Sequence, residues 1–301
     1  MKSLLYLLTI PLLFITCQTS AQTIESLQDE IQQIVSTKNA FVGVSISGNN
    51  GIDTVSLNGA RHYPLQSVFK FHIALAVLSQ IDKGRFQFDQ KIKINRKDLL
   101  PNLYSPIRED YPNGVTLPIS KILEYTVSRS DNVGCDVLLK LIGGPKVVEN
   151  YFLNNNVKDL SIKFNEEKQQ ANWDLQFQNW TTPIEANKTL EKFYFNKNEL
   201  LSKKSYDLIW NIMRETETGA ARLKGQLPKE TTVAHKTGSS GANKDGITAA
   251  VNDIGIVFLP NGNHFFISVF ITNSKENAET NEKIIADIAK ATWDYFTTKT
   301  K

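Results

Sequence analysis

The residues with the clearest chemical potential are Ser67 and Lys70, which stand three positions apart. An apolar run follows to Leu78 and predicts a buried helix, in which a cation is costly unless it is paired or has a function. Residues three apart share a helix face, and an amine there could accept the proton that a lone serine hydroxyl does not lose at neutral pH. The pair predicts a nucleophilic serine, although a serine cap followed by an ordinary lysine would give the same pattern.

Two further motifs follow along the chain. Ser130-Asp131-Asn132 lies between two helical patterns, and Lys236-Thr237-Gly238 ends a predicted strand. Ser-x-x-Lys, Ser-Asp-Asn and Lys-Thr-Gly in this order are the signature set of serine enzymes that react with penicillins. Because all three occur in order, each in a suitable element, acyl transfer to a serine is favoured over a chance match.

On these motifs the sequence resembles the class A serine β-lactamases, and within them the extended-spectrum, cephalosporinase-leaning subgroup (PER/VEB-like). The resemblance covers the whole mature chain, and three phrases support the subgroup: Gln66-Ser67-Val68-Phe69-Lys70, Ser130-Asp131-Asn132-Val133-Gly134-Cys135-Asp136 and Gln178-Asn179-Trp180. It implies the α/β two-domain fold of serine β-lactamases and D,D-peptidases, an antiparallel sheet flanked by N- and C-terminal helices plus an all-helical domain. The implied activity is hydrolysis of the β-lactam ring of penicillins and especially cephalosporins through a serine acyl-enzyme, which confers β-lactam resistance.

The resemblance implies four catalytic residues. Ser67 would attack the lactam carbonyl, and Ser130 would pass a proton to the departing nitrogen. Lys70 and Glu166 would manage the proton of the nucleophile, and which of them is the acylation base stays open. Glu166 would also activate a water for deacylation, with the adjacent Glu167 as the alternative.

The resemblance also implies a set of substrate contacts. The amide of Asn132 can donate and accept, which suits the side-chain amide of a substrate. Lys236 offers a cation to the substrate carboxylate, and Thr237 adds a hydroxyl. Arg222 matches a second carboxylate-binding position, with a surface charge as the alternative, and Tyr104 matches an aromatic beside the cleft, with plain packing as the alternative.

The expected oxyanion hole consists of backbone groups. The N–H groups of Ser67 and Ser239 match its two positions, and one such donor is worth ~10²–10³ in rate. Between them in the predicted site, Gly238 has no side chain, which would let the substrate lie against the strand edge.

The polar stretch 161–182 departs from the more usual class A loop. That loop has a Pro after its Glu and an Asn four positions beyond it, where this chain has Glu167 and Gln170. Its closing Arg–Asp ion pair is replaced by Phe164 and Asn179. We therefore expect an Ω-loop without that ion pair, on a different path, with Gln170 able to bind a water and with room for bulky oxyimino cephalosporins.

Hydrophobic periodicity indicates which elements must position these residues. Helices are expected at 24–37, 67–82, 119–127, 133–142, 183–194, 202–214 and 278–296, and strands at 41–46, 54–57, 231–237, 247–259 and 264–272. Gly143-Gly144-Pro145 is expected to stop a helix. Strands at both ends of the chain predict one discontinuous α/β domain, 22–60 with 218–301, around a helical domain, 61–217.

Residues 1–21 read as a signal peptide. Lys2 precedes an apolar run of 13 residues, Leu4–Thr16, whereas a membrane span needs ~20. Cleavage near Ala21 would release a periplasmic or secreted protein of a Gram-negative bacterium, with no membrane contact after cleavage. Cys17 could instead be a lipoprotein cysteine, but Phe14-Ile15-Thr16 before it fits that alternative poorly.

Composition excludes several other functions. The 301 residues carry a net charge of +3, which gives no electrostatic footprint for nucleic acid. Two cysteines cannot build a disulfide scaffold, and one of them lies in the predicted signal. The four histidines show no metal-ligand spacing, and no glycine-rich phosphate loop is present. We expect no cofactor or metal, small-molecule β-lactams as the partners, and a monomer.

Three related functions compete with this interpretation. A D,D-peptidase or penicillin-binding protein shares the three motifs but lacks the deacylating Glu. A β-lactam sensor domain would normally follow transmembrane segments. A serine glutaminase of related fold would not carry an export signal.

Overall fold

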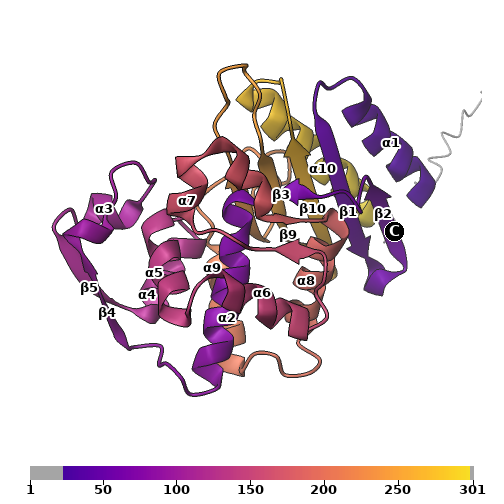
Figure 1. Cartoon of the computed structure of the whole chain (residues 1–301). Coiled ribbons are helices and arrows are strands. Elements are labelled where there is room, and N and C mark those ends of the chain that lie inside the picture. Colours follow the sequence, from indigo (N-terminus) through magenta and orange to yellow (C-terminus); the bar gives the residue numbers. More distant parts are fainter. Residues whose placement is uncertain (1–22, 299–301) are drawn as a thin grey trace, which may run out of the picture.

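The computed structural model describes residues 23–298, so the predicted signal peptide, Cys17 and the cleavage site lie outside the described residues. A five-stranded antiparallel sheet occupies the centre, in the order β2-β1-β10-β9-β8 (Figure 1). Its strands are β1 (Phe41–Gly48), β2 (Asp53–Leu57), β8 (Val233–Ser239), β9 (Val251–Phe258) and β10 (His264–Thr272). The strand order joins the two ends of the chain in one layer, because β1 pairs with β10.

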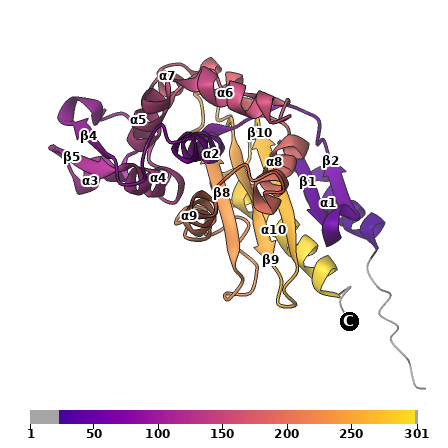
Figure 2. The same ribbon diagram turned by 90° about the horizontal axis from the view of Figure 1, so that it is seen from below.

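Helices cover both faces of this sheet. Figure 2 shows α1 (Ile24–Ser36) and α10 (Ala278–Thr298) on one side and the remaining helices on the other. Those helices are α2 (Phe69–Asp82), α3 (Pro106–Asp110), α4 (Ile119–Val127), α5 (Asn132–Ile142), α6 (Pro145–Asn154), α7 (Glu166–Ala171), α8 (Pro183–Phe195) and α9 (Lys203–Arg214). Short 3-10 turns are η1 (Asn49–Gly51), η2 (Gln66–Val68), η3 (Arg96–Asp98) and η4 (Trp173–Gln178). Two-residue strands β3 (Tyr63–Pro64), β6 (Leu160–Ser161) and β7 (Trp180–Thr181) form a small sheet, and β4 (Lys91–Asn95) pairs with β5 (Gly114–Pro118).

Alternation along the strands divides the apolar side chains between two cores. On β10, Phe265 and Ile267 face the core that contains α1 and α10, whereas Phe266 and Phe270 face the core of the helical side. Because successive strand residues point to opposite faces, one strand supports both layers. The sheet is therefore buried on both sides, and its free edge at β8 borders the helical part.

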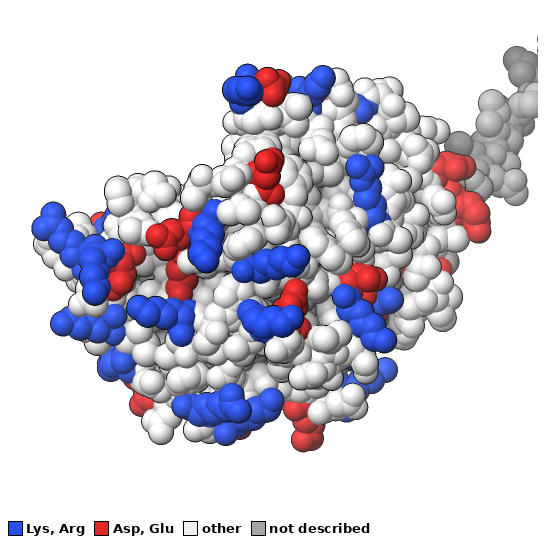
Figure 3. Space-filling view, viewed as in Figure 1, with Lys and Arg blue, Asp and Glu red and all other residues white. Residues whose placement is uncertain are grey.

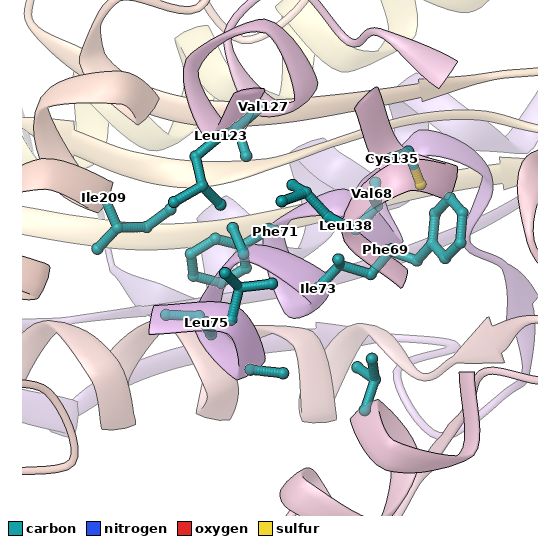
Figure 4. Packing of buried hydrophobic residues seen from close by; sticks show 14 of the residues in the cluster. Val68, Phe69, Phe71, Ile73, Leu75, Leu123, Val127, Cys135, Leu138 and Ile209 are labelled. Atoms are coloured by element: carbon teal, nitrogen blue, oxygen red, sulfur yellow. The ribbon is translucent and has the colours of Figure 1, made fainter. Parts of the chain in front are cut away.

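Helix α2 runs through the centre of the helical part. Thirteen of its residues, Phe69 to Ile81, are buried, so it has no solvent face. Figure 4 shows Phe71 and Ile73 of α2 among Leu123 of α4, Leu138 of α5 and Ile209 of α9. The prediction of a buried helix is confirmed, and it places Lys70 in the interior.

The structure differs from the predicted elements at several places. Ser67 lies in the 3-10 turn η2, two residues before α2 begins at Phe69, rather than in the helix itself. Gly143-Gly144-Pro145 does end α5, but Pro145 also begins α6, which was missed. Proline is favoured at the first helical position because that N–H needs no partner within the helix.

The expected domain division at residues 61 and 217 stays a prediction. No helix among residues 23–298 is long and apolar enough to cross a membrane.

Candidate active site

The turn η2 presents Ser67 at the start of α2. The preceding residue, Gln66, has a positive φ of 46°, which is uncommon for a residue with a side chain. Its side-chain amide donates to Gln176 Oε1 of η4 over 2.6 Å. A sharp turn fixed by this buried contact therefore carries the serine, which remains partly exposed.

Lys70 connects three side chains behind the serine. Its Nζ donates to Ser67 Oγ at 2.6 Å and to Asn132 Oδ1 at 2.7 Å, and it forms an ion pair with Glu166. An ammonium has three donors, and all three are used here. Lys70 is fully buried and Glu166 is 3% exposed, so the pair is shielded from water and held on the inner side of the serine.

Glu166 begins the short helix α7, and a buried carboxylate fixes the start of that helix. Asp136 of α5 accepts from the backbone N–H groups of Glu166 at 2.8 Å and Glu167 at 3.0 Å, and from Asn165 Nδ2 at 2.8 Å. A carboxylate at a helix N-terminus is favourable, while burial raises the pKa of Asp136 to about 6. The sequence interpretation gave Asp136 no role, because nothing in the sequence indicates that its partners lie 30 residues away.

The loop 161–182 is closed by an amide instead of an ion pair. Asn179 is fully buried; its Oδ1 accepts from Lys163 N at 2.7 Å and Phe164 N at 3.0 Å, and its Nδ2 donates to Phe164 O at 2.8 Å. The backbone O of Asn179 also accepts from Leu65 N at 2.8 Å. The expectation that Phe164 and Asn179 form no ion pair is met in the described part of the loop, and the amide explains how the loop is held.

The second wall of the site contains another buried lysine. Lys236 of β8 donates to Ser130 Oγ at 2.9 Å and to Thr237 O at 2.9 Å. Burial, together with the nearby positive charge of Lys70, lowers the pKa of Lys236 well below its ordinary value. Ser130 has a positive φ of 57°, and the buried carboxylate of Asp131 supports its turn by accepting from Gly134 N at 2.7 Å.

The free edge of β8 provides a backbone donor. Ser240 N donates to Ala250 O of the neighbouring strand at 2.9 Å. Because adjacent N–H groups on a strand point in opposite directions, the N–H of Ser239 points to the free edge, on which Ser67 lies. Gly238 also has a packing role: a Cβ there would lie 2.6 Å from Leu65 O, so a glycine is needed for β8 to pack against the segment that leads into η2.

These groups surround a cleft of about 260 Å³. It is lined by Gln66, Ser67, Tyr104, Ser130, Asn132, Glu166, Gln170, Thr218, Gly219, Arg222, Thr237 and Ser239. Lys70, Lys236 and Gly238 do not line it and lie behind its surface. Thr218 and Gly219 were not predicted to line the cleft, because neither belongs to a sequence motif. The Oγ1 atoms of Thr218 and Thr237 lie 2.6 Å apart.

Three residues at the edge of the cleft differ in their exposure to solvent and in their hydrogen bonds. Arg222 is 7% exposed and donates to Gly238 O at 3.1 Å and Ser239 Oγ at 2.7 Å of β8 and to Asn252 O of β9 at 2.9 Å, while its Nε pairs with Glu282 at 3.2 Å, so its donors are held by the protein. Tyr104 is 54% exposed at the rim of the cleft. Gln170 is exposed, and its side chain borders the cleft near Glu166.

Nothing in the described residues gathers metal ligands. No group of three or more His, Cys, Asp or Glu side chains between residues 23 and 298 could hold a metal ion. Cys135 is a buried free thiol, and burial raises its pKa well above the ordinary value.

Comparison with known proteins gives one consistent family. Residues 26–296 match the model of the Beta-lactamase enzyme family. The chain is 56% identical to beta-lactamase VEB-1 of Pseudomonas aeruginosa, over 97% of each chain. It is 41% identical to the extended-spectrum beta-lactamase PER-1 of Pseudomonas aeruginosa, over 94% of this chain and 91% of that one.

The fold agrees with solved structures of the same kind. The crystal structure of TLA-1 extended-spectrum beta-lactamase superposes with a TM-score of 0.88 at 50% identity, covering 92% of this chain and 99% of that one. An ancestral class A beta-lactamase, 23% identical, has a TM-score of 0.79, which shows that the two chains share a fold.

Proposed function

The chain belongs to the β-lactamase enzyme family as a class A member, and we propose that it hydrolyses penicillins and especially cephalosporins through an acyl-enzyme on Ser67. The observation that carries this proposal is the position of Lys70, whose Nζ contacts Ser67, Asn132 and Glu166 at once. A serine beside a buried proton-accepting pair is an activated nucleophile. Hydrolysis of the ring would confer resistance to β-lactams.

Acylation begins at Ser67. Its Oγ attacks the lactam carbonyl while its proton passes to the cluster of Lys70 and Glu166 that it contacts. Negative charge develops on the carbonyl oxygen, and the N–H groups of Ser67 and Ser239 stabilise it from two sides. Both donors belong to rigid elements, η2 and β8, so they need no rearrangement when the charge appears.

Ring opening requires a proton at the lactam nitrogen. Ser130 borders the cleft, and its Oγ accepts a hydrogen bond from Lys236. That contact orients the hydroxyl and favours its loss of a proton. Ser130 thus relays a proton: it protonates the departing nitrogen and is itself reprotonated with the proton that the cluster of Lys70 and Glu166 took from Ser67.

Deacylation requires a water and a base. Glu166 combines burial, a fixed helix start and a position on the cleft wall, and we assign it as the base that activates this water. Glu167 points its exposed side chain elsewhere, toward a second cavity. The carboxylate separates this function from that of a D,D-peptidase, which would keep its acyl group.

The remaining cleft residues provide substrate contacts. The Asn132 amide and the Thr237 hydroxyl face the cleft and can bind the amide and the carboxylate of a β-lactam. Lys236 supplies the positive charge for that carboxylate. Arg222 contributes mainly through Ser239 Oγ, to which it donates, while Tyr104 and Gln170 contact substituents at the rim.

The substrate range extends to bulky cephalosporins. The relatives PER-1 and TLA-1 are described as extended-spectrum enzymes, and this chain closes its Ω-loop through Asn179 rather than an ion pair. The test is steady-state hydrolysis of benzylpenicillin, cefotaxime and ceftazidime by purified enzyme. Turnover of benzylpenicillin with cefotaxime and ceftazidime left untouched would contradict this part of the proposal.

One experiment tests the reaction itself. Nitrocefin is mixed with the enzyme, and absorbance and intact mass are followed together. Sustained hydrolysis is expected. A stable adduct on Ser67 without turnover would instead indicate a peptidase or a sensor.

The location of the enzyme follows from residues 1–21. Their composition supports export, cleavage near Ala21 and release into the periplasm. The mass of the mature protein in a periplasmic fraction tests this, and a mass that retains Cys17 with a lipid would indicate an anchored form.

A further inference from the structure

A second cavity, larger than the catalytic cleft, lies on the other side of the wall that carries Glu166. It has a volume of about 490 Å³, within the range of small-molecule sites, ~300–1,000 Å³. Neighbouring residues face the two cavities alternately: Asn132 and Glu166 line the cleft, whereas Val133 and Glu167 line the second cavity. The first turns of α5 and α7 therefore separate the two cavities.

The floor of this cavity is apolar. Its accessible apolar surface comes from the partly exposed Leu100 and Val137, which lie over Leu103, Val133 and Leu139, each at most 2% exposed. Water in contact with such a floor is displaced favourably by an apolar body. The floor therefore suits an aromatic or branched aliphatic group.

The rim of the cavity is basic. Its four lysines are Lys97, Lys140, Lys163 and Lys168. All four are exposed, and between residues 23 and 298 none of them forms an ion pair. Figure 3 shows blue side chains over the part of the face where α5 and α7 lie, with red ones between them.

The rim also carries acids, but its four lysines outnumber its three acids by one charge. Three acids line the cavity, Asp98, Asp136 and Glu167. Asp98 already accepts from Asn95 N at 2.8 Å, and Asp136 already accepts the N–H groups at the start of α7. Cationic donors around an apolar floor are complementary to an organic anion.

We propose that this cavity binds an organic anion with an apolar body, such as an aryl sulfonate or an aryl carboxylate, at a site distinct from the catalytic cleft. The apolar body lies on Leu100 and Val137, and the anionic group pairs with lysines of the rim. Because Asp136 and Glu167 line the cavity and adjoin Glu166, an occupant contacts the residues that position the deacylating carboxylate. Occupancy is therefore coupled to deacylation.

The test uses naphthalene-2-sulfonate and the full-length mature enzyme. Its affinity is measured by calorimetry for wild type, for the double variant K140Q/K163Q and for the matched control K229Q/K275Q. Lys229 and Lys275 are exposed and line none of the described cavities. Nitrocefin turnover in the absence of the probe checks that all three proteins are folded.

One molecule is expected to bind per wild-type chain. Two exposed ion pairs are worth ~0.2–1 kcal/mol each, so K140Q/K163Q should weaken binding about two- to thirty-fold, and the control should not. Added salt should weaken wild-type binding, and inhibition of nitrocefin turnover by the probe should be non-competitive. Equal binding by all three proteins, or purely competitive inhibition, would overturn the proposal, because the probe would then occupy another surface or the catalytic cleft.

Discussion

Lys70 and Lys236 lie in opposite walls of the cleft and are both fully buried, but their side chains have different partners. Lys70, on the helical wall, forms an ion pair with Glu166 and donates to Ser67 and Asn132. Lys236, on the β8 wall, donates only to neutral oxygens, those of Ser130 and Thr237. In the part of the chain that the structure describes, no carboxylate forms an ion pair with Lys236.

This difference indicates that the two walls have different functions. A buried cation without an acid is strongly unfavourable, and an anionic substrate relieves that cost when it binds. Lys236 is therefore suited to bind a carboxylate. The charge of Lys70 is balanced before the substrate arrives, so the pair with Glu166 can exchange protons with Ser67 and with water at little electrostatic cost.

Removing the acid of the helical wall should have the largest effect. Glu166→Gln keeps the size of the side chain but not its basicity, so the enzyme should acylate and then stall. Loss of a general base lowers the rate by up to ~10⁴. A single burst of nitrocefin hydrolysis and an acyl adduct on Ser67, seen by mass, would show this.

The control is the neighbouring carboxylate. Glu167→Gln makes the same chemical change on an exposed side chain that lines the other cavity, and steady-state turnover should be nearly unchanged. Normal turnover in Glu166→Gln together with stalling in Glu167→Gln would transfer the role of the base to Glu167.

Removing the cation of the β8 wall should act on both substrate binding and the transition state. Lys236→Met keeps the length of the side chain but leaves the substrate carboxylate without its partner. Truncating a buried charge pair costs about 2–5 kcal/mol, so kcat/KM should fall roughly 30- to 5,000-fold. Lys236→Arg should recover part of this loss, and equal activity of both variants would show that the charge is not needed.

Asn179→Ala tests how the helical wall is supported. The variant removes three hydrogen bonds to backbone groups of Lys163 and Phe164, which contribute ~0.5–1.5 kcal/mol each. The free energy of unfolding should fall by about 2–4 kcal/mol, and the rate of deacylation should fall with it. Thermal unfolding and single-turnover kinetics measure the two effects.

A matched control is Asn172→Ala. It removes the hydrogen bond that the exposed side-chain amide of Asn172 accepts from Asp174 N. It should change stability by about 1 kcal/mol or less and leave deacylation intact. If Asn179→Ala unfolds no earlier than Asn172→Ala, the amide does not hold the loop.

The catalytic residues could be predicted from the sequence, but the residues that hold them in position could not. Ser67, Lys70, Ser130 and Lys236 stand in short motifs, and the structure brings all four together, as the resemblance implied. The residues that hold these four in position could not be predicted from motifs. The carboxylate of Asp136 and the amide of Asn179 act on backbone groups 15 to 31 positions away, and backbone partners leave no pattern of residue types.

The predictions of secondary structure were correct for the long elements and failed for α6 and for the shortest strands. The long helices and β1, β8, β9 and β10 were correctly interpreted, because each of them contributes apolar residues to a continuous core. Helix α6 was missed because Pro145 was interpreted only as the end of α5, although it also begins the next helix. The two-residue strands β3, β6 and β7 are too short to show a period.

The smallest expected effect is a pH dependence that separates the two lysines. Burial lowers the pKa of Lys236 well below its ordinary value, so its charge is lost in the free enzyme as the pH rises through that lowered value. Since kcat/KM reports ionisations of the free enzyme, its alkaline limb should begin below the ordinary lysine pKa, ~10.4, mainly through an increase in KM. Lys236→Arg should move that limb to higher pH because arginine stays charged, and an unchanged limb would show that Lys236 is not the group that ionises.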